Sequence, residues 1–232
     1  MFGYPTGVGA LIARRDAAAV LRPVYFGGGA TVDATAEDAW RILLPAPEGL
    51  EAGTVPFLSI AALKHGFDLL DSLGGMAAIE AHTESLRSWA FPRLSALRHA
   101  SGGPLLRIFG AHGEGAAAQA GIFQFLVLRP DGSLVAGTQV LADACRSGLH
   151  LRIGCHCNPG QCLFDLGIRP EEERARSLGG YVDFLTVMRP GPGGKLLPVQ
   201  LPTGAVRASL GALSRFEDVY ALEEFLRRTY LQ

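Results

Sequence analysis

The sequence lacks the features that mark several classes of protein. Its formal net charge at pH 7 is −1, so it has no overall positive field to attract nucleic acid or an anionic membrane. It contains no apolar run near the roughly 20 residues that a membrane span requires. It also has no low-complexity tract and no internal repeat. We therefore expect neither a nucleic-acid partner nor a membrane partner.

Cysteine is scarce, with four residues in a chain of 232, and three of them lie close together. This is not the pattern of a secreted domain held together by disulfides, so we expect a reducing, cytoplasmic location. The N-terminus lacks the charged-then-apolar order of a signal peptide. It opens instead on a Gly/Pro-rich turn, as though the chain were part of a longer one.

The composition, 48% hydrophobic and 19% charged, is that of a globular protein. The pattern predicts an α/β fold in two parts, with the end of a larger α/β unit at residues 1–100 and a small α+β domain at 101–232. In the first part we expect a strand at 8–13, a helix from Phe57 to Leu70 and a longer helix from Met76 toward Leu97. The stretch "SGGP" at 101–104 is the predicted hinge.

The second part alternates between short apolar runs and turn residues. We expect strands at 105–109, 122–128, 149–153 and 205–210, and a return strand at 134–140 after the turn Pro130-Asp131-Gly132. A short polar helix is predicted at 171–177, and an apolar stripe from Val219 to Leu231 predicts a final helix.

The stretch "RIGCHCNPGQC" at 152–162 holds Cys155, Cys157 and Cys162. Three interpretations fit it. The first is a disulfide. Cys155 and Cys157 are too close together for an easy bridge, whereas a bridge from Cys157 to Cys162 is geometrically feasible. The expected reducing compartment argues against both bridges. The second is a metal site, for which thiolates and histidines are suitable ligands, but a closed zinc site needs four ligands and no second pair of cysteines follows.

The third interpretation is a nucleophilic loop. A turn at Asn158-Pro159-Gly160 would project Cys157 from the end of a strand, with Arg152 and His156 supplying local positive charge. Cys155 and Cys162 would then be structural or auxiliary thiols. Clustering beside a Gly-Pro turn favours this interpretation over three inert small residues.

Several motifs together resemble one family. "FGYPTGVGALIAR", "VYFGGGAT", "GTVPFLSIAALKHGFD", "LRIGCHCNPGQC" and "PTGAVRASLG" stand here in the order seen in molybdenum cofactor sulfurases. These enzymes are similar to cysteine desulfurases and share the class V aminotransferase fold, which uses pyridoxal phosphate. The resemblance covers almost the whole chain and implies part of that fold, namely the end of its large domain and its small C-terminal domain.

The resemblance implies a chemistry and a set of partners. Pyridoxal phosphate activates L-cysteine, a loop thiolate takes its sulfur as a persulfide, and alanine is released. The sulfur then passes to the molybdenum cofactor or its carrier. The full-length protein is implied to be a homodimer and an enzyme, a sulfurtransferase of which this chain is an incomplete part.

The resemblance also implies roles for individual residues. Cys157 matches the persulfide cysteine, and Cys155 and Cys162 match the cysteines that flank it. Arg207 matches the arginine that grips the substrate carboxylate, a task that suits a planar guanidinium. Gly53 and Thr54 match a pair that reaches the cofactor phosphate of the neighbouring subunit. From sequence alone, Arg207 could also be a surface arginine at a strand edge, and Thr54 a plain helix cap.

One expected residue is missing. The lysine that anchors the cofactor should stand immediately before the position of Met1, ahead of Phe2-Gly3. The chain has only Lys64 and Lys195, and neither matches that lysine. A misassigned start codon, a split gene and a decayed or repurposed remnant would each explain this, and we expect the chain alone to be inactive.

Two alternatives to the sulfurase remain. One is part of a general cysteine desulfurase that serves another sulfur acceptor. The other is a thiol-bearing module that relays sulfur without a cofactor and is not an enzyme. We expect no metal in the site.

Overall fold

A computed structural model describes residues 7–115, 118–175 and 182–232. The chain divides into two compact units, Met1–Met76 and Ala77–Gln232. This division lies earlier than the expected hinge at residue 101. The reason is that most of the long helix α3 (Gly75–Ser95) packs against the sheet of the second unit through Ala90 and Leu94.

The first unit contains little regular structure. The expected helix at Phe57 is present as α2, but the strand expected at 8–13 is wrong. This segment is extended and has no strand partner among the described residues, and Leu11 and Ile12 are 81% and 96% exposed. The elements of this unit are helices α1 (Arg15–Val20) and α2 (Phe57–Ser72), strands β1 (Thr31–Ala34) and β2 (Arg41–Leu43), and the short turns η1 (Gly28–Ala30) and η2 (Glu48–Leu50).

Few side chains of the first unit are buried. Among its described residues, Ala30 is the only buried apolar side chain, at 1% exposure. Helix α2 leaves Phe57, Leu58 and Ile60 between 44% and 76% exposed. An amphipathic helix is stabilised mainly by packing its apolar face, so α2 lacks its usual source of stability within the described chain.

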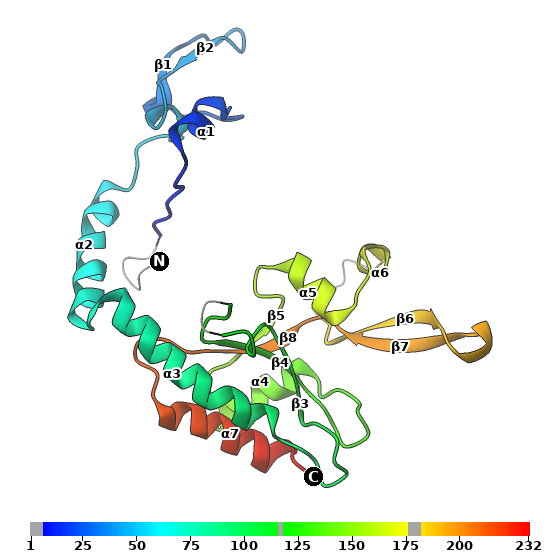
Figure 1. Cartoon of the computed structure of the whole chain (residues 1–232). Helices are drawn as coiled ribbons and strands as arrows, with labels where there is room; N and C mark the ends of the chain where they lie inside the picture. The colour runs from blue at the N-terminus through cyan, green and yellow to red at the C-terminus, as the bar shows by residue number, and fades with distance from the viewer. Residues whose placement is uncertain (1–6, 116–117, 176–181) are drawn as a thin grey trace. The chain divides into compact units, whose positions relative to one another are not determined.

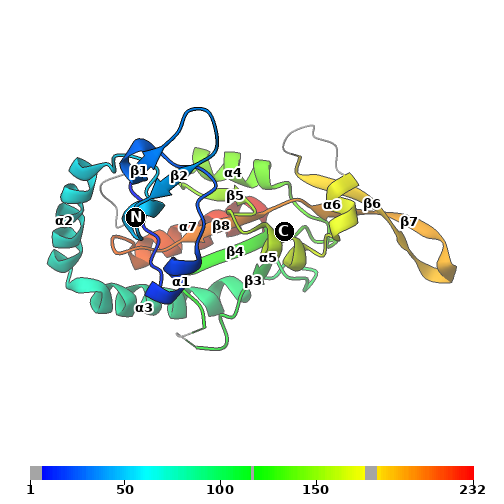
Figure 2. The same ribbon diagram turned by 90° about the horizontal axis from the view of Figure 1, so that it is seen from above.

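The second unit is built on a four-stranded antiparallel sheet with the order β3-β4-β8-β5. Figures 1 and 2 show helices α3 and α7 running alongside each other next to this sheet. Side chains from α3, α4, α7 and one sheet face form the main core, including Leu94, Phe125, Val140 and Leu226. The strands are β3 (Leu106–Phe109), β4 (Ile122–Val127), β5 (Arg152–Gly154) and β8 (Ala205–Ser209), and the helices are α4 (Gly137–Arg146) and α7 (Phe216–Tyr230).

Two short helices and a hairpin complete this unit. Helices α5 (Pro159–Leu166) and α6 (Pro170–Ala175) follow the cysteine loop, and residues 176 and 177 of the predicted polar helix lie outside the described residues. Strands β6 (Phe184–Pro190) and β7 (Leu196–Pro202) form a hairpin, closed by the turn η3 (Pro192–Gly194), that extends away from the sheet (Figures 1 and 2). Within the described chain, no helix combines the length and apolar character needed to cross a bilayer.

Two expectations about this unit need correction. The return strand at 134–140 is wrong, because only a single bridge from Leu128 to Leu134 forms before helix α4 begins. Val140 and Ala144, four residues apart, are both fully buried, so helical periodicity outweighs the local strand pattern. The β6–β7 hairpin was not predicted, since its prolines and glycines resemble loop sequence.

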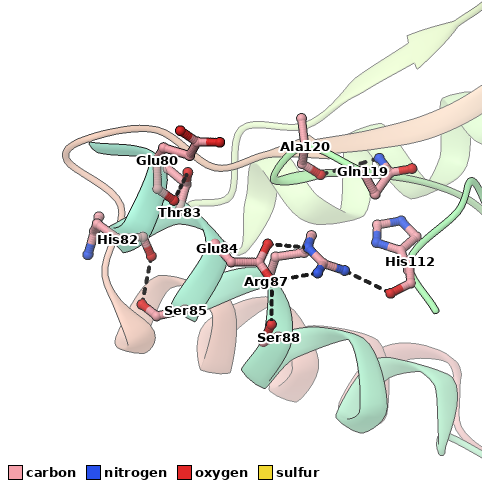
Figure 3. A network of polar contacts seen from close by, with 10 residues as sticks. All are labelled: Glu80, His82, Thr83, Glu84, Ser85, Arg87, Ser88, His112, Gln119 and Ala120. Carbon is pink, nitrogen blue, oxygen red and sulfur yellow. Dashed lines mark hydrogen bonds and ion pairs between the residues drawn. The ribbon is translucent and has the colours of Figure 1, made fainter. Parts of the chain in front are cut away.

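A buried polar network joins α3 to the loop after β3 (Figure 3). Arg87 is 3% exposed and binds both carboxylate oxygens of Glu84, with Nε–Oε2 at 2.7 Å and Nη2–Oε1 at 2.6 Å. Its Nη1 donates to the His112 carbonyl at 2.8 Å. The His112 ring lies between Phe91 and Phe123, with centroid separations of 5.0 and 4.6 Å. The network therefore fixes this loop against the core.

Candidate functional site

The cysteine loop connects the end of β5 to the start of α5. Pro159 stands at the helix start, where it has no backbone hydrogen bond to lose. The side chain of Asn158 caps the helix by accepting from the Gln161 N–H at 3.3 Å. The Asn-Pro-Gly stretch is thus the beginning of a helix, and Cys157 lies just outside it as an exposed free thiol.

The backbone at the thiol is in a rare conformation. His156 and Cys157 have φ values of 54° and 62°, and they are the only non-glycine residues with positive φ among those that the structure describes. A non-glycine residue in the left-handed region costs of order 1–3 kcal/mol, and such residues concentrate at functional sites. The strained pair makes Cys157 the candidate functional residue of the loop.

The flanking cysteines, expected to be structural or auxiliary thiols, are not free. Cys155 and Cys162 are joined in a disulfide, with their Cα atoms 5.2 Å apart. The first turn of α5 brings Cys162 back to the end of β5, where it is 2% exposed. The feasible bridge from Cys157 to Cys162 is not formed. The described residues also contain no group of three or more His, Cys, Asp or Glu that could hold a metal ion.

Two glycines allow the loop to approach strand β8 closely. A Cβ atom on Gly204 would lie 2.5 Å from the Cα of Gly154. Gly154 itself has a φ of 115°, which disfavours any other residue. The Pro-Thr-Gly turn before β8 and the glycine before Cys155 are therefore in backbone contact, so the two sequence motifs meet in space.

Arg207 lies on β8 beside this loop. It is opposite Gln124 of β4 and Arg152 of β5, and directly opposed residues project from the same sheet face. The neighbouring Val206 and Ile153 point to the main core, so Arg207 points to the other face. That is the face where Ala205 and Leu126 pack with Cys162 and Leu166. The structure therefore places Arg207 and the cysteine loop on one face of the sheet.

The side chain of His156 does not supply the positive charge that we expected. Burial of the imidazole, followed by the charge of Arg207, lowers its pKa below the ordinary histidine value, and Arg152 adds to this. Both ring nitrogens are buried, and the backbone of Ala205 offsets only part of this lowering of the pKa. The ring is therefore neutral at pH 7, and Arg152 and Arg207 carry the positive charge of the site.

Gly53 and Thr54 lie in the first unit, in the loop before α2. The N-cap of α2 is Pro56, and no side chain caps the helix, so Thr54 is not a helix cap. The glycine triplet at 27–29 packs against this loop, because a Cβ on Gly27 would lie 1.6 Å from the Ala52 carbonyl oxygen and one on Gly29 would lie 2.9 Å from the Gly53 carbonyl carbon. The unit thus brings two predicted motifs together, leaving the Thr54 side chain exposed.

Neither lysine suits the anchoring of a cofactor. Lys64 forms an exposed ion pair with Asp68 on α2, with Nζ–Oδ1 at 2.7 Å. Lys195 follows the turn at the tip of the β6–β7 hairpin, far along the strand from Pro202 and the Pro-Thr-Gly turn. Phe2-Gly3, where the resemblance places the anchor context, lies outside the described residues. The described chain thus holds an exposed free thiol and Arg207 near each other, but no amine suited to a Schiff base.

Comparison with known proteins agrees with the geometry. The family model for class-V aminotransferases matches residues 1–222. This chain belongs to the class-V aminotransferase family. It is 38% identical to molybdenum cofactor sulfurase from Homo sapiens, covering 100% of this chain and 26% of that protein, and 39% identical to molybdenum cofactor sulfurase from Arabidopsis thaliana, covering 97% and 27%.

The fold comparison extends to solved structures. A cysteine desulfurase from Escherichia coli matches with a TM-score of 0.63 at 20% identity, covering 97% of this chain and 42% of that chain. The class-V member described here thus has part of the cysteine desulfurase fold, as the motifs predicted. It spans about a quarter of the length of the curated relatives it matches, with 26% of the human protein covered.

The sequence predicted the thiol and Arg207 as site residues but did not predict how they are arranged in space. The opposed arginines depend on the register between β5 and β8, which no local pattern reveals. The disulfide was not predicted because the expected reducing compartment argued against any disulfide in the loop. The helix start at Asn158-Pro159 is the one local pattern that could have revealed it, since a helical turn places Cys162 back beside Cys155.

Proposed function

We propose that this chain is the C-terminal part of the catalytic region of a molybdenum cofactor sulfurase. One observation carries the proposal most strongly. Cys157 is the one free cysteine of the motif, it is exposed and strained, and the loop that holds it begins at β5, beside Arg207 of β8. The two molybdenum cofactor sulfurases named above, at 38% and 39% identity, support the same assignment.

The proposed step is the transfer of sulfur from L-cysteine to Cys157. Its thiolate attacks the sulfur of the substrate, so the S–S bond of a persulfide forms while the Cβ–S bond of the substrate breaks. The transferred sulfur is oxidised to the sulfane level, and the carbon keeps the electron pair and takes up a proton to give alanine. Bound pyridoxal phosphate would supply the electron sink for this chemistry, from an anchor that the two lysines of this chain do not provide.

In this proposal the residues of the chain orient the reactants. Arg207 would hold the carboxylate of L-cysteine through its planar guanidinium. The left-handed backbone at His156 and Cys157 would present the thiol above that site, and the disulfide between Cys155 and Cys162 would hold both ends of the loop. The persulfide would then deliver its terminal sulfur to the molybdenum cofactor.

The partners and location belong to the same proposal. Gly53 and Thr54 would bind the cofactor phosphate of a second subunit in a homodimer, which is supported by the exposed Thr54 side chain and the tightly packed glycine loop beside it. We place the protein in the cytoplasm because cysteine is scarce. Cytosolic disulfides are usually catalytic or redox-active, so Cys155–Cys162 is compatible with this location.

Labelling tests the proposal in the protein as it occurs, with whatever sequence surrounds these 232 residues. Radiolabelled L-cysteine is added with pyridoxal phosphate, and the label is mapped by peptide. We expect one sulfur on Cys157 for each alanine formed, with loss of both products in Cys157→Ser and no change in Cys145→Ser, which removes the other free thiol. Label that persists in Cys157→Ser would contradict the proposal.

The exposed free thiol of Cys157 would also suit a second candidate, a sulfur-relay module without a cofactor. Such a module would accept a persulfide on Cys157 from a separate donor and would release no alanine. Supplying polysulfide to the 232-residue chain alone separates the two functions. The relay predicts that Cys157 of the unaccompanied chain is loaded with sulfur and that this chain is active as a sulfur carrier. The sulfurase predicts that desulfuration of L-cysteine needs additional sequence.

A further inference from the structure

Two guanidinium groups are adjacent on the face that carries the cysteine loop. Arg152 of β5 and Arg207 of β8 are directly opposed across the antiparallel pair. Opposed side chains have Cβ atoms about 4.5–5.5 Å apart and share one face of the sheet. Both arginines therefore project beside the loop that holds Cys157.

Nothing in the described chain neutralises this pair. Neither arginine forms an ion pair, although the described structure contains several others, such as Arg87 with Glu84 and Arg189 with Glu172. The Nε atom of Arg207 is buried and has no hydrogen-bond partner. Like charges placed directly opposite each other destabilise a sheet, and a buried donor without a partner adds a further penalty. Both penalties would be relieved by a bound anion.

The other groups around the pair leave this charge unopposed. Gln124 is the neighbour of Arg207 on β4, and it is neutral. His156 lies within electrostatic range of both arginines and is itself neutral at pH 7. On α5, Asp165 accepts a hydrogen bond from Gln161 at 2.7 Å and forms no ion pair with either arginine. The pair is therefore a local concentration of positive charge in a chain whose net charge is −1.

We propose that Arg152 and Arg207 form one site for a small molecule with two anionic groups. Arg207 would take the carboxylate, and Arg152 would take the second negative charge, which on L-cysteine is the thiolate sulfur that faces Cys157. The proposal rests on the proposed function for the identity of the substrate. Arg152 is thereby assigned to the site as a second binding residue, in addition to the carboxylate grip of Arg207.

Alkylation of Cys157 tests the site without any need for cofactor or turnover. Iodoacetate carries a carboxylate and iodoacetamide is neutral, so the ratio of their rates reports the local positive potential. Cys145, the other exposed free cysteine, is an internal reference in the same molecule. Peptide mapping of the full chain gives both ratios in one sample. We expect the ratio at Cys157 to exceed that at Cys145 and to fall with added salt.

Substitution then identifies Arg152 as the source. Arg152→Gln removes one charge from an exposed position and should lower the ratio at Cys157 about two- to fivefold, the range of an exposed charge interaction, while leaving Cys145 unchanged. Arg129→Gln, which removes an exposed arginine next to the turn before α4, is the matched control and should change neither ratio. A ratio at Cys157 that is the same in Arg152→Gln and the parent chain would overturn the proposal.

A second arm tests the requirement for two anionic groups. L-cysteate carries a carboxylate and a sulfonate, whereas L-serine carries a carboxylate and a neutral hydroxyl. L-cysteate should protect Cys157 from iodoacetamide at lower concentration than L-serine, and Arg152→Gln should abolish that preference. Equal protection by the two amino acids would overturn the assignment of a second anionic group. If instead the preference is found but no persulfide forms on Cys157, the anion site stands and the proposed function fails.

Discussion

The two units of this chain differ in how they use apolar side chains. In the second unit, Leu94, Phe125 and Leu226 are 0–1% exposed and belong to one core. In the first unit, helix α2 also carries large apolar side chains, yet Leu58 is 76% exposed and Ile60 is 44% exposed. Helix-forming sequence is present in both units, but only the second supplies the surface that such helices need. The second unit is therefore expected to be the stable one, and it holds both Cys157 and Arg207.

The largest effect expected from this difference comes from a matched pair of leucines. Leu94→Ala on α3 removes a side chain that is 1% exposed and should lower the free energy of unfolding by about 2–5 kcal/mol. Leu58→Ala on α2 should change it by less than about 0.5 kcal/mol. Urea denaturation in a Trp40→Phe background, which leaves Trp89 on α3 as the one fluorescent tryptophan, measures both, and equal losses would contradict the difference between the units.

A pair of glycines sharpens the comparison at the site itself. Gly204→Ala places a methyl group 2.5 Å from the backbone of Gly154 and should cost about 1–3 kcal/mol of stability while moving the end of β5. Gly160→Ala lies in the same motif with open space around it, within helix α5, and should be neutral or slightly stabilising. Thermal unfolding together with the rate of Cys157 alkylation compares them. A tolerated Gly204→Ala would argue against the close approach of the two motifs.

A smaller effect is expected from acid. Burial of His112, followed by the charge of Arg87, lowers the pKa of its imidazole below the ordinary value of about 6.5. As the pH falls, His112 therefore binds a proton in the unfolded chain before it does so in the folded chain. The contribution of the neutral His112 to stability is complete above a pH of about 6.5 and is lost as the pH falls from there through the lower pKa of the folded chain.

His112→Phe keeps the stacked ring between Phe91 and Phe123 and removes the titration. The decrease in unfolding free energy between pH 7 and pH 5 should shrink in this variant, and the remainder includes His156, whose pKa is also lowered. The exposed His150→Asn is the control and should leave the decrease unchanged. An unaltered pH dependence in His112→Phe would show that His112 does not contribute.

The sequence predicted more of the second unit than of the first. The helix at Phe57 and the strands β3, β4 and β8 have strong local patterns and are found close to their expected positions. The strand at 8–13 had a similar apolar pattern but has no strand partner in the described chain, so its local preference has nothing to stabilise it. Residues 137–140 of the expected return strand belong to helix α4, because the packing of Val140 and Ala144 decides between two local patterns.

At the candidate site, local patterns identified residues and tertiary structure determined their relations. The family motif named Cys157 and Arg207, and turn chemistry indicated an exposed thiol. The disulfide, the neutral His156 and the opposition of Arg152 and Arg207 depend on the start of α5 and on the register of β8, which are properties of the folded sheet. The pairing of two like charges could not have been read from positions 55 residues apart.

Hydrogen exchange across the whole chain tests the central claim most directly. Amide exchange reports local opening free energies, which range from near zero in poorly packed segments up to the global stability in the core. The account predicts strong protection in β4, β8 and the buried turns of α3 and α7, and weak protection throughout α2, whose described residues bury only Gly66. Protection of α2 equal to that of α3 would contradict the claim that the second unit alone carries the stable framework of the site.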